Sequence, residues 1–287
     1  MKLQNLVTVV TGASQGLGRA IAEEFVRQGA HVAICARDSN LLETVRSHLE
    51  DLATSRQKII AQIGDVSSPD QMDEFFRCTE REIGLVDVLV NNAGVYGPKG
   101  PSESVDLNEW SRALEINLLG TFIPTRFAIA HMKKKGRGKI INLSGGGATN
   151  PLPRLSAYAA SKAAVVRLTE TLAEELQEFS IAVNAIAPGA LNTRLLDEVL
   201  QAGPELVGPG FFDKALKQRE TGGAPMGKGV ALCVFLASAA SDGITGKLIS
   251  ALWDPWEKLP DFRSELASSD IYTLRRIVPE DRGKKFG

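Results

Sequence analysis

Short runs of almost wholly apolar, β-branched residues recur along the first two thirds of this chain of 287 residues. Such runs are typical of parallel strands that are buried on both faces of a sheet. They are Val7–Val10, Val32–Ala36, Ile59–Ile63, Val86–Val90, Lys139–Leu143 and Ile181–Ala187. The intervening segments carry apolar residues at three- and four-residue spacing, typical of amphipathic helices, as in Ala20–Gln28, Leu41–Leu52 and Gln71–Ile83. This alternation predicts an α/β fold, a doubly wound parallel sheet with helices on both faces in a single domain.

A glycine-rich segment joins the first strand to the first helix. It reads Thr11-Gly12-Ala13-Ser14-Gln15-Gly16-Leu17-Gly18. Glycines at such a junction let the backbone turn tightly and approach a pyrophosphate, whose charge the helix N-terminus stabilises. The segment therefore predicts a dinucleotide-binding site, with a merely structural turn as the alternative.

The spacing of these glycines is GxxxGxG, which resembles the fingerprint of the short-chain dehydrogenase/reductase family. Further motifs match that family in order: Asp65-Val66, Asn91-Asn92-Ala93-Gly94, Asn117, Tyr158-Ala159-Ala160-Ser161-Lys162, Pro188-Gly189 and Thr193. The resemblance runs from about Leu3 to Trp253 and implies a Rossmann-type domain over residues 1–253.

The resemblance also implies a cofactor site. Asp65 is expected to hold the adenine, and Thr193 to contact the nicotinamide carboxamide. The segment Asn91–Gly94 is expected to support the central strand and line the cofactor. The expected cofactor-binding residues are Gly12, Ser14, Gln15, Gly16, Leu17, Gly18, Arg37, Asp65, Val66, Asn91, Ala93, Gly94, Tyr158, Lys162, Pro188, Gly189 and Thr193.

The end of the second strand indicates which nicotinamide cofactor is preferred. An acidic residue there usually accepts hydrogen bonds from the ribose 2′-hydroxyl of NAD, whereas NADP needs a cation for its 2′-phosphate. This chain has Ala36 at that place and Arg37 next, and a guanidinium suits a phosphate. The sequence therefore predicts NADP over NAD. The alternative is that Arg37 is an ordinary solvated charge and that Asp38 only caps the next helix.

Tyr158 and Lys162 are four residues apart in a helical stretch, Ser156–Phe179, so their side chains share one face. The phenol of an unperturbed tyrosine has a pKa of about 10. It acts as a base at neutral pH only when a nearby cation stabilises the phenolate. We expect Lys162 to supply the cation. Tyr158 then exchanges a proton with the substrate oxygen while a hydride moves to or from the nicotinamide. By resemblance, Asn117 holds a water in a proton relay to Lys162; the alternative is a residue at a helix kink.

The catalytic serine of the family is displaced in this chain. The family places it about thirteen residues before the tyrosine, where this sequence has Gly145, and the nearest serine is Ser144. Three alternatives follow. Ser144 reaches the site because the neighbouring glycines allow a different turn, or Thr149 or Ser156 substitutes for it. Otherwise the chain binds the cofactor with weak or altered activity.

Two segments depart from the regular alternation. Residues 191–224 combine glycines with apolar side chains, as expected of a substrate lid, with a surface helix pair as the alternative. Residues 254–287 form a C-terminal extension whose apolar part is expected to pack onto the body or a neighbouring subunit, with a mobile basic tip. Arg154, in a loop beside the expected pocket, is a candidate partner for a substrate carboxylate or phosphate.

Net charge and composition limit the partners. The formal charge of −1 lacks the basic excess typical of proteins that bind nucleic acid or acidic membranes. No signal peptide is apparent and no apolar run approaches the roughly 20 residues of a membrane helix, so we expect a cytoplasmic protein. Three widely spaced cysteines without a CxxC pair predict no metal site, and Cys35 and Cys233 read as buried thiols.

These observations predict an oxidoreductase that transfers a hydride between NADP(H) and a ketone or secondary alcohol. The substrate is expected to be a small molecule of the 3-oxoacyl, sugar or polyol, or general carbonyl type. A non-catalytic nucleotide-binding sensor or assembly subunit is the alternative, because Gly145 stands at the serine position. The resemblance suggests a homodimer or homotetramer.

Overall fold

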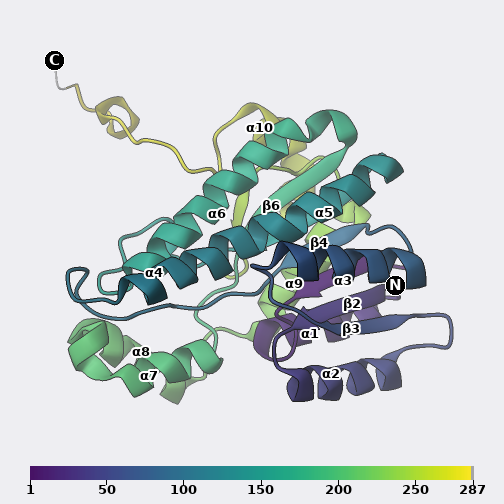
Figure 1. Cartoon of the computed structure of the whole chain (residues 1–287). Helices are drawn as coiled ribbons and strands as arrows, with labels where there is room; N and C mark the ends of the chain where they lie inside the picture. The colour runs from purple at the N-terminus through teal and green to yellow at the C-terminus, as the bar shows by residue number, and fades with distance from the viewer. Residues whose placement is uncertain (286–287) are drawn as a thin grey trace.

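A computed structural model describes residues 1–285 and contains a parallel sheet of seven strands in the order β3-β2-β1-β4-β5-β6-β7 (Figure 1). The strands are β1 (Val7–Thr11), β2 (His31–Ala36), β3 (Ile59–Ile63), β4 (Val88–Asn91), β5 (Gly138–Leu143), β6 (Ile181–Ala187) and β7 (Leu248–Ser250). The chain reverses its direction of winding between β3 and β4. The carboxyl ends of β1 and β4 are therefore neighbours, and a crevice opens at such a point in a doubly wound sheet.

Helices cover both faces of the sheet (Figure 1). One face carries α1 (Gly16–Arg27), α2 (Ser39–Leu52) and α9 (Met226–Ala237), with Phe25 and Cys233 buried against the strands. The other carries α3 (Pro69–Glu82), α5 (Gly120–Lys135) and α6 (Ser156–Glu175), with Phe75 and Phe76 buried. The expected single Rossmann-type domain with helices on both faces is confirmed.

The sequence predicts six strands, and residues 1–285 contain all six and a seventh. β7 pairs in parallel with Ala185–Ala187 of β6 and forms the sheet edge. It has only three residues, too few for a hydropathy pattern to distinguish them from a loop.

Residues 191–224 form a helix pair beside the carboxyl ends of the strands. It consists of α7 (Arg194–Val207) and α8 (Pro209–Thr221), joined at Gly208. α7 kinks at Gly203, whose φ of 76° is in the left-handed region that favours glycine. The two helices pack against each other through Leu196, Val199, Val207 and Ala215. They form a surface helix pair, as one alternative expected. They also lie beside the carboxyl ends of the strands, which is the position that the other alternative, a substrate lid, requires.

The C-terminal extension joins the core before it leaves the body. Trp256 and Leu259, in a 3₁₀ segment Trp256–Phe262, are buried in the same cluster as α1 and α9. Leu266 of α10 (Arg263–Ser268) is buried there as well. Leu274 packs toward α6, and beyond it the chain extends away from the body (Figure 1). No helix among residues 1–285 is long and apolar enough to span a membrane.

Candidate active site

A cavity of about 1270 Å³ runs along the carboxyl ends of the strands, from Arg37 at one end to the α7–α8 pair at the other. Most of the predicted cofactor residues line it: Gly12, Ser14, Gln15, Gly16, Leu17, Arg37, Asp65, Val66, Ala93, Gly94, Tyr158, Lys162, Pro188, Gly189 and Thr193. Gly18, Asn91 and Asn117 do not line it. The sequence predictions thus converge on one site, with three residues placed behind its wall.

The glycine loop is packed so closely that two of its positions have no room for a side chain. A Cβ at Gly12, which has a φ of 63°, would lie 2.7 Å from Cα of Ala93. The Nδ2 of Asn92 donates to the carbonyl oxygens of Thr11 and Gly12 at 3.0 Å, and it fills the space in front of Gly18. Gly18 therefore shapes the loop from behind, while Asn92 lines the cavity, as expected of the Asn91–Gly94 segment although Asn92 was not among the individually expected residues.

The start of α1 suits an anionic group. Gln15 at its N-cap makes no side-chain hydrogen bond to the helix, and the first turn has no acidic residue. The first N–H groups of the helix are thus left without a side-chain acceptor at the cavity wall, where Gly16 and Leu17 lie. A pyrophosphate fits this arrangement, because the N–H groups and dipole of the helix N-terminus stabilise its negative charge.

The end of β2 presents a cation to the cavity. Arg37 is exposed on the cavity wall, and Ala36 before it is buried. The carboxylate of Asp38 accepts a hydrogen bond from the backbone N–H of Leu41 at 2.9 Å and caps α2. The expected capping role of Asp38 is therefore present together with an exposed Arg37.

Asp65 follows β3 on the cavity wall and holds several polar contacts. Its carboxylate accepts hydrogen bonds from the backbone N–H of Ser67 at 2.9 Å and from its hydroxyl at 2.6 Å. Arg112 of α4 (Leu107–Leu114) forms an ion pair with it. Burial raises the pKa of Asp65, but the hydrogen bonds from Ser67 and the charge of Arg112 together lower it below its ordinary value. Asp65 is thus a fixed anion on the wall.

Asn91 differs from its expected position. Its side chain is buried and donates to Thr125 at 2.8 Å and to Asn142 on β5 at 2.9 Å. It supports the central strands, as predicted, but does not line the cavity. The reason is strand alternation, since neighbouring residues point to opposite sides and Asn92 therefore faces the cavity instead.

Asn117 lies in a π-helical turn, Glu115–Leu119, between α4 and α5. Its Oδ1 accepts from the backbone N–H of Val95 at 2.9 Å, and its Nδ2 donates to the Val95 carbonyl at 2.9 Å and to Ser161 at 2.9 Å. The side chain thus clamps the segment after Gly94 to the wall of α6. The helix irregularity that one alternative expected is therefore present. A water relay through Asn117 would have to use atoms other than its side-chain Oδ1 and Nδ2.

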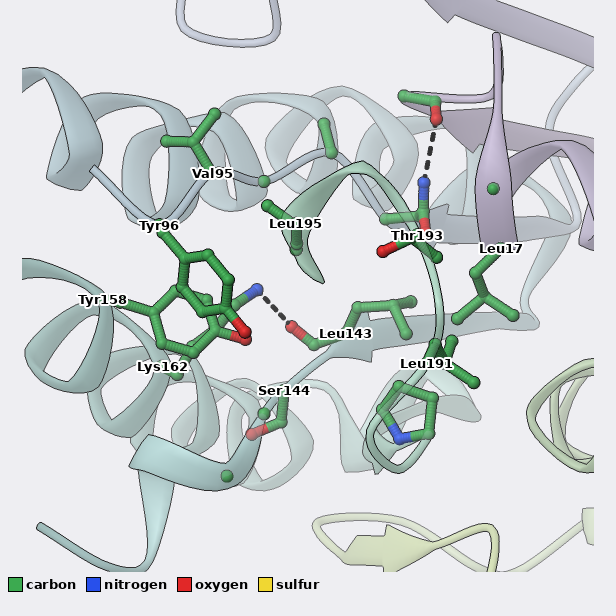
Figure 2. A pocket seen from close by; sticks show the side chains of 18 of the residues that line it. Leu17, Val95, Tyr96, Leu143, Ser144, Tyr158, Lys162, Leu191, Thr193 and Leu195 are labelled. Carbon is green, nitrogen blue, oxygen red and sulfur yellow. Dashed lines mark hydrogen bonds between the residues drawn. The ribbon is translucent and has the colours of Figure 1, made fainter. Parts of the chain in front are cut away.

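Tyr158 and Lys162 lie one turn apart on α6, and both are buried. The Nζ of Lys162 donates to the Leu143 carbonyl at 2.7 Å and lies 5.8 Å from the Tyr158 ring centroid (Figure 2). Burial lowers the pKa of Lys162 to about 8. Burial, and to a smaller extent Tyr96, raises the pKa of Tyr158 above its ordinary value. The phenol is therefore a neutral proton donor at pH 7 beside an ammonium group.

Gly145 takes the place of the family serine, and its neighbour does not replace it. A Cβ at Gly145 would point at the Tyr158 hydroxyl, closer than 3.0 Å. The Ser144 Oγ is buried, has no hydrogen-bond partner within residues 1–285, and points away from that hydroxyl (Figure 2). A shift of one residue at a strand end turns a side chain to the opposite side. Ser144 therefore contributes to the cavity wall without offering its hydroxyl to it.

The hydroxyls of the other two predicted substitutes accept hydrogen bonds from neighbouring side chains. The Ser156 Oγ accepts a hydrogen bond from the Trp110 indole at 3.1 Å and does not line the cavity. Thr149 lines the cavity but is exposed, and its hydroxyl accepts from Asn150 at 3.1 Å. Arg154 donates to the backbone carbonyl of Glu205 on α7 at 2.6 Å and does not line the cavity either. It anchors the helix pair, contrary to its expected contact with substrate.

Tyr96 is a cavity residue that the sequence analysis missed. Its ring centroid lies 4.6 Å from that of Tyr158, and the two rings meet at 63° (Figure 2). It lies two residues after Gly94, in a loop. The hydrophobic periodicity that locates helices and strands gives no information about the length or position of such a loop. The available signal was its place directly after a motif that lines the cavity.

Comparisons with known proteins agree with this geometry. A family model described as short chain dehydrogenase matches residues 6–203. The 3beta-hydroxysteroid dehydrogenase 1 of Eggerthella lenta is 41% identical over 206 residues, which are 71% of this chain and 77% of that protein. The structure of NAD⁺-bound xylitol dehydrogenase superposes with a TM-score of 0.80 and 26% identity, covering 87% of this chain and 98% of the other. The structure of a gluconate 5-dehydrogenase from Burkholderia cenocepacia in complex with NADP and tartrate superposes with a TM-score of 0.76 and 27% identity. The match covers 87% of this chain and 94% of the other.

Proposed function

Because the chain belongs to the short-chain dehydrogenase family, which includes the oxidoreductases of alcohols and ketones compared above, we propose that it transfers a hydride between NADP(H) and a ketone or secondary alcohol. The observation that carries this proposal is the pair Tyr158 and Lys162, buried on α6 and lining the same cavity as the glycine loop. A proton donor and a nucleotide-binding loop on one cavity are what carbonyl reduction requires.

The chemistry divides between cofactor and chain. When bound, the nicotinamide supplies the hydride for reduction or accepts it in oxidation. In reduction, the Tyr158 hydroxyl donates its proton to the carbonyl oxygen while the carbonyl carbon receives the hydride, so that the C=O bond becomes an alcohol. The resulting phenolate is stabilised by the Lys162 ammonium, which is held by Leu143. Oxidation reverses each of these steps.

The preference for NADP rests on Arg37. Its guanidinium is exposed on the cavity wall where β2 ends, and the neighbouring Asp38 carboxylate is engaged by the N-terminus of α2. A 2′-phosphate gains a charge-assisted hydrogen bond from such a guanidinium. An acidic group there would repel the phosphate. Asp38, which follows Arg37 and also lines the cavity, has one carboxylate oxygen engaged by the backbone of α2.

The substrate is expected to have an apolar body and one reacting oxygen. The end of the cavity away from Arg37 is lined by Leu152, Leu191, Leu195, Leu196, Val199 and Phe211. Apolar walls of this kind favour a hydrocarbon body, while the polar side chains Asn150, Asn192, Lys214 and Gln218 on the same cavity are available to a small number of polar groups. Among the three substrate types, this supports a general carbonyl substrate.

The proposal is tested by turnover of ketones with NADPH and of alcohols with NADP⁺, using cyclic and aryl ketones and their alcohols. The Tyr158→Phe variant is expected to lose turnover by at least about 10³-fold while its Kd for NADPH stays within about twofold, because only a hydroxyl used in the transition state is removed. Cofactor binding without turnover by the unmodified chain would instead favour the non-catalytic sensor, which Gly145 motivates.

A further inference from the structure

We propose that the Tyr96 hydroxyl donates the hydrogen bond to the substrate oxygen that other members of the family obtain from a serine. The oxygen would then lie between two phenols, with Tyr158 as the proton donor and Tyr96 as the group that holds and polarises it. This inference rests on the proposed carbonyl chemistry and assigns a catalytic residue to it.

The position of Tyr96 supports this role. Both rings line the cavity, and their centroids are 4.6 Å apart, so the two phenols share one wall (Figure 2). Gly145 offers no side chain at the family position, and the Ser144 Oγ is sealed from the cavity without a partner. Of the hydroxyls considered for the vacant role, Tyr96 is the one placed beside Tyr158.

The Tyr96 ring is held from two directions. The preceding residue, Val95, exchanges two hydrogen bonds of 2.9 Å with the Asn117 side chain, which fixes the backbone of the loop. The Nζ of Lys99 lies 5.8 Å from the centroid of the Tyr96 ring. A donor that is held before the substrate arrives stabilises developing charge without the cost of reorganisation.

The environment also keeps Tyr96 protonated. Burial, followed by the nearby carboxylate of Glu198, raises the pKa of Tyr96 above its ordinary value. A neutral phenol can donate a hydrogen bond, whereas a phenolate can only accept one. Tyr96 is therefore a donor throughout the pH range in which a dehydrogenase works.

Tyr96 also connects the reacting oxygen to the helix pair. Its ring packs against the cluster formed by Leu196 and Val199 of α7. Glu198 of the same helix lies 3.5 Å from Lys99 Nζ, and the Lys99 side chain is only 13% exposed. Tyr96, Lys99 and the α7 wall of the substrate cavity thus form one packed unit.

The decisive variant is Tyr96→Phe, which keeps the ring and its packing and removes only the hydroxyl. With the ketone that the unmodified chain reduces fastest, we expect kcat to fall by about 10²–10³-fold, the scale for loss of one preorganised donor. The Kd for NADPH should stay within about twofold. Thr171→Val is the control for loss of a hydroxyl away from the cavity, because Thr171 is exposed on α6 and does not line the cavity. It should retain activity.

Outcomes for the reaction and for the inference can be told apart. If Tyr158→Phe abolishes turnover and Tyr96→Phe stays within about threefold of the unmodified chain, the reaction stands and the Tyr96 assignment is wrong. If Tyr158→Phe retains turnover, or the unmodified chain reduces none of the ketones, the proposed chemistry fails and the assignment with it.

Discussion

The phenol of Tyr158 fills the space in front of Gly145, so that a Cβ on residue 145 would lie less than 3.0 Å from the phenol oxygen. Gly145 has an extended backbone with a φ of −168°, which any residue can adopt. The position therefore needs glycine for lack of space and not for conformation. Tyr158 stands nearer to the end of β5 than a serine at 145 would allow.

We predict that Gly145→Ala lowers turnover by about 10–10²-fold while cofactor binding is retained. The added methyl group must displace the Tyr158 hydroxyl, and a shift of about 1 Å in a catalytic group has an effect of this size. Gly146→Ala is the matched control, because a Cβ there meets no atom within 4 Å. Equal activity of the two variants would show that the Tyr158 ring adapts freely. Gly145→Ser should likewise lower activity, although it restores the residue that the family uses.

Arg37→Ala should weaken NADPH binding by about 10-fold to about 150-fold, because a charge-assisted contact contributes roughly 1.5–3 kcal/mol. NADH binding should change by less than about twofold, since NADH has no 2′-phosphate. Fluorescence titration of both cofactors measures the two affinities. A parallel loss for NADH and NADPH would mean that Arg37 supports the loop and does not read the phosphate.

Lys162→Met should make the protein more stable at pH 7. Burial lowers the pKa of Lys162 from 10.5 to about 8 in the folded chain. Between these two values the unfolded chain binds more protons, so the free energy of unfolding contributed by this group rises with pH and is lowest below pH 8. The cost below pH 8 is about 3 kcal/mol, and it is absent in the methionine variant.

Chemical denaturation between pH 7 and pH 10 measures this difference. The stability gap between Lys162→Met and the unmodified chain should close as the pH rises, because deprotonation removes the charge from the buried lysine. Lys162→Arg keeps the charge and should show no such gain. A gap independent of pH would indicate that packing, and not ionisation, separates the variants.

Two truncations should separate the two parts of the C-terminal extension. Removal of residues 256–287 takes Trp256, Leu259 and Leu266 out of the core, so we expect the melting temperature to fall by more than about 10 °C or folding to fail. Removal of residues 276–287 spares these side chains and should leave melting within about 2 °C. Similar melting temperatures for both truncated chains would show that the buried tryptophan contributes little.

The parts of the site that sequence predicted and missed differ in a physical way. Tyr158 and Lys162 could be assigned because helical spacing puts them on one face and the accompanying family motifs give that face a role, and Arg37 could be assigned from its place at a strand end. Asn91 and Ser144 were placed one position out, since the side to which a side chain turns at a strand end depends on where pairing stops. Tyr96 was invisible because its neighbour in space, Tyr158, lies far along the chain.

β7 has three residues and lies at the edge of the sheet. A later segment of the same chain covers its outer side. The backbone N–H of Leu248 donates to the carbonyl oxygen of Tyr272 at 2.8 Å, which occupies a donor that a foreign strand would otherwise pair with. The returning segment is tied down by the Leu274 N–H, which donates to Glu170 on α6 at 2.6 Å. A sheet whose last strand is shielded in this way is protected against edge-to-edge association, so loss of the segment would open this edge to pairing with strands of other molecules.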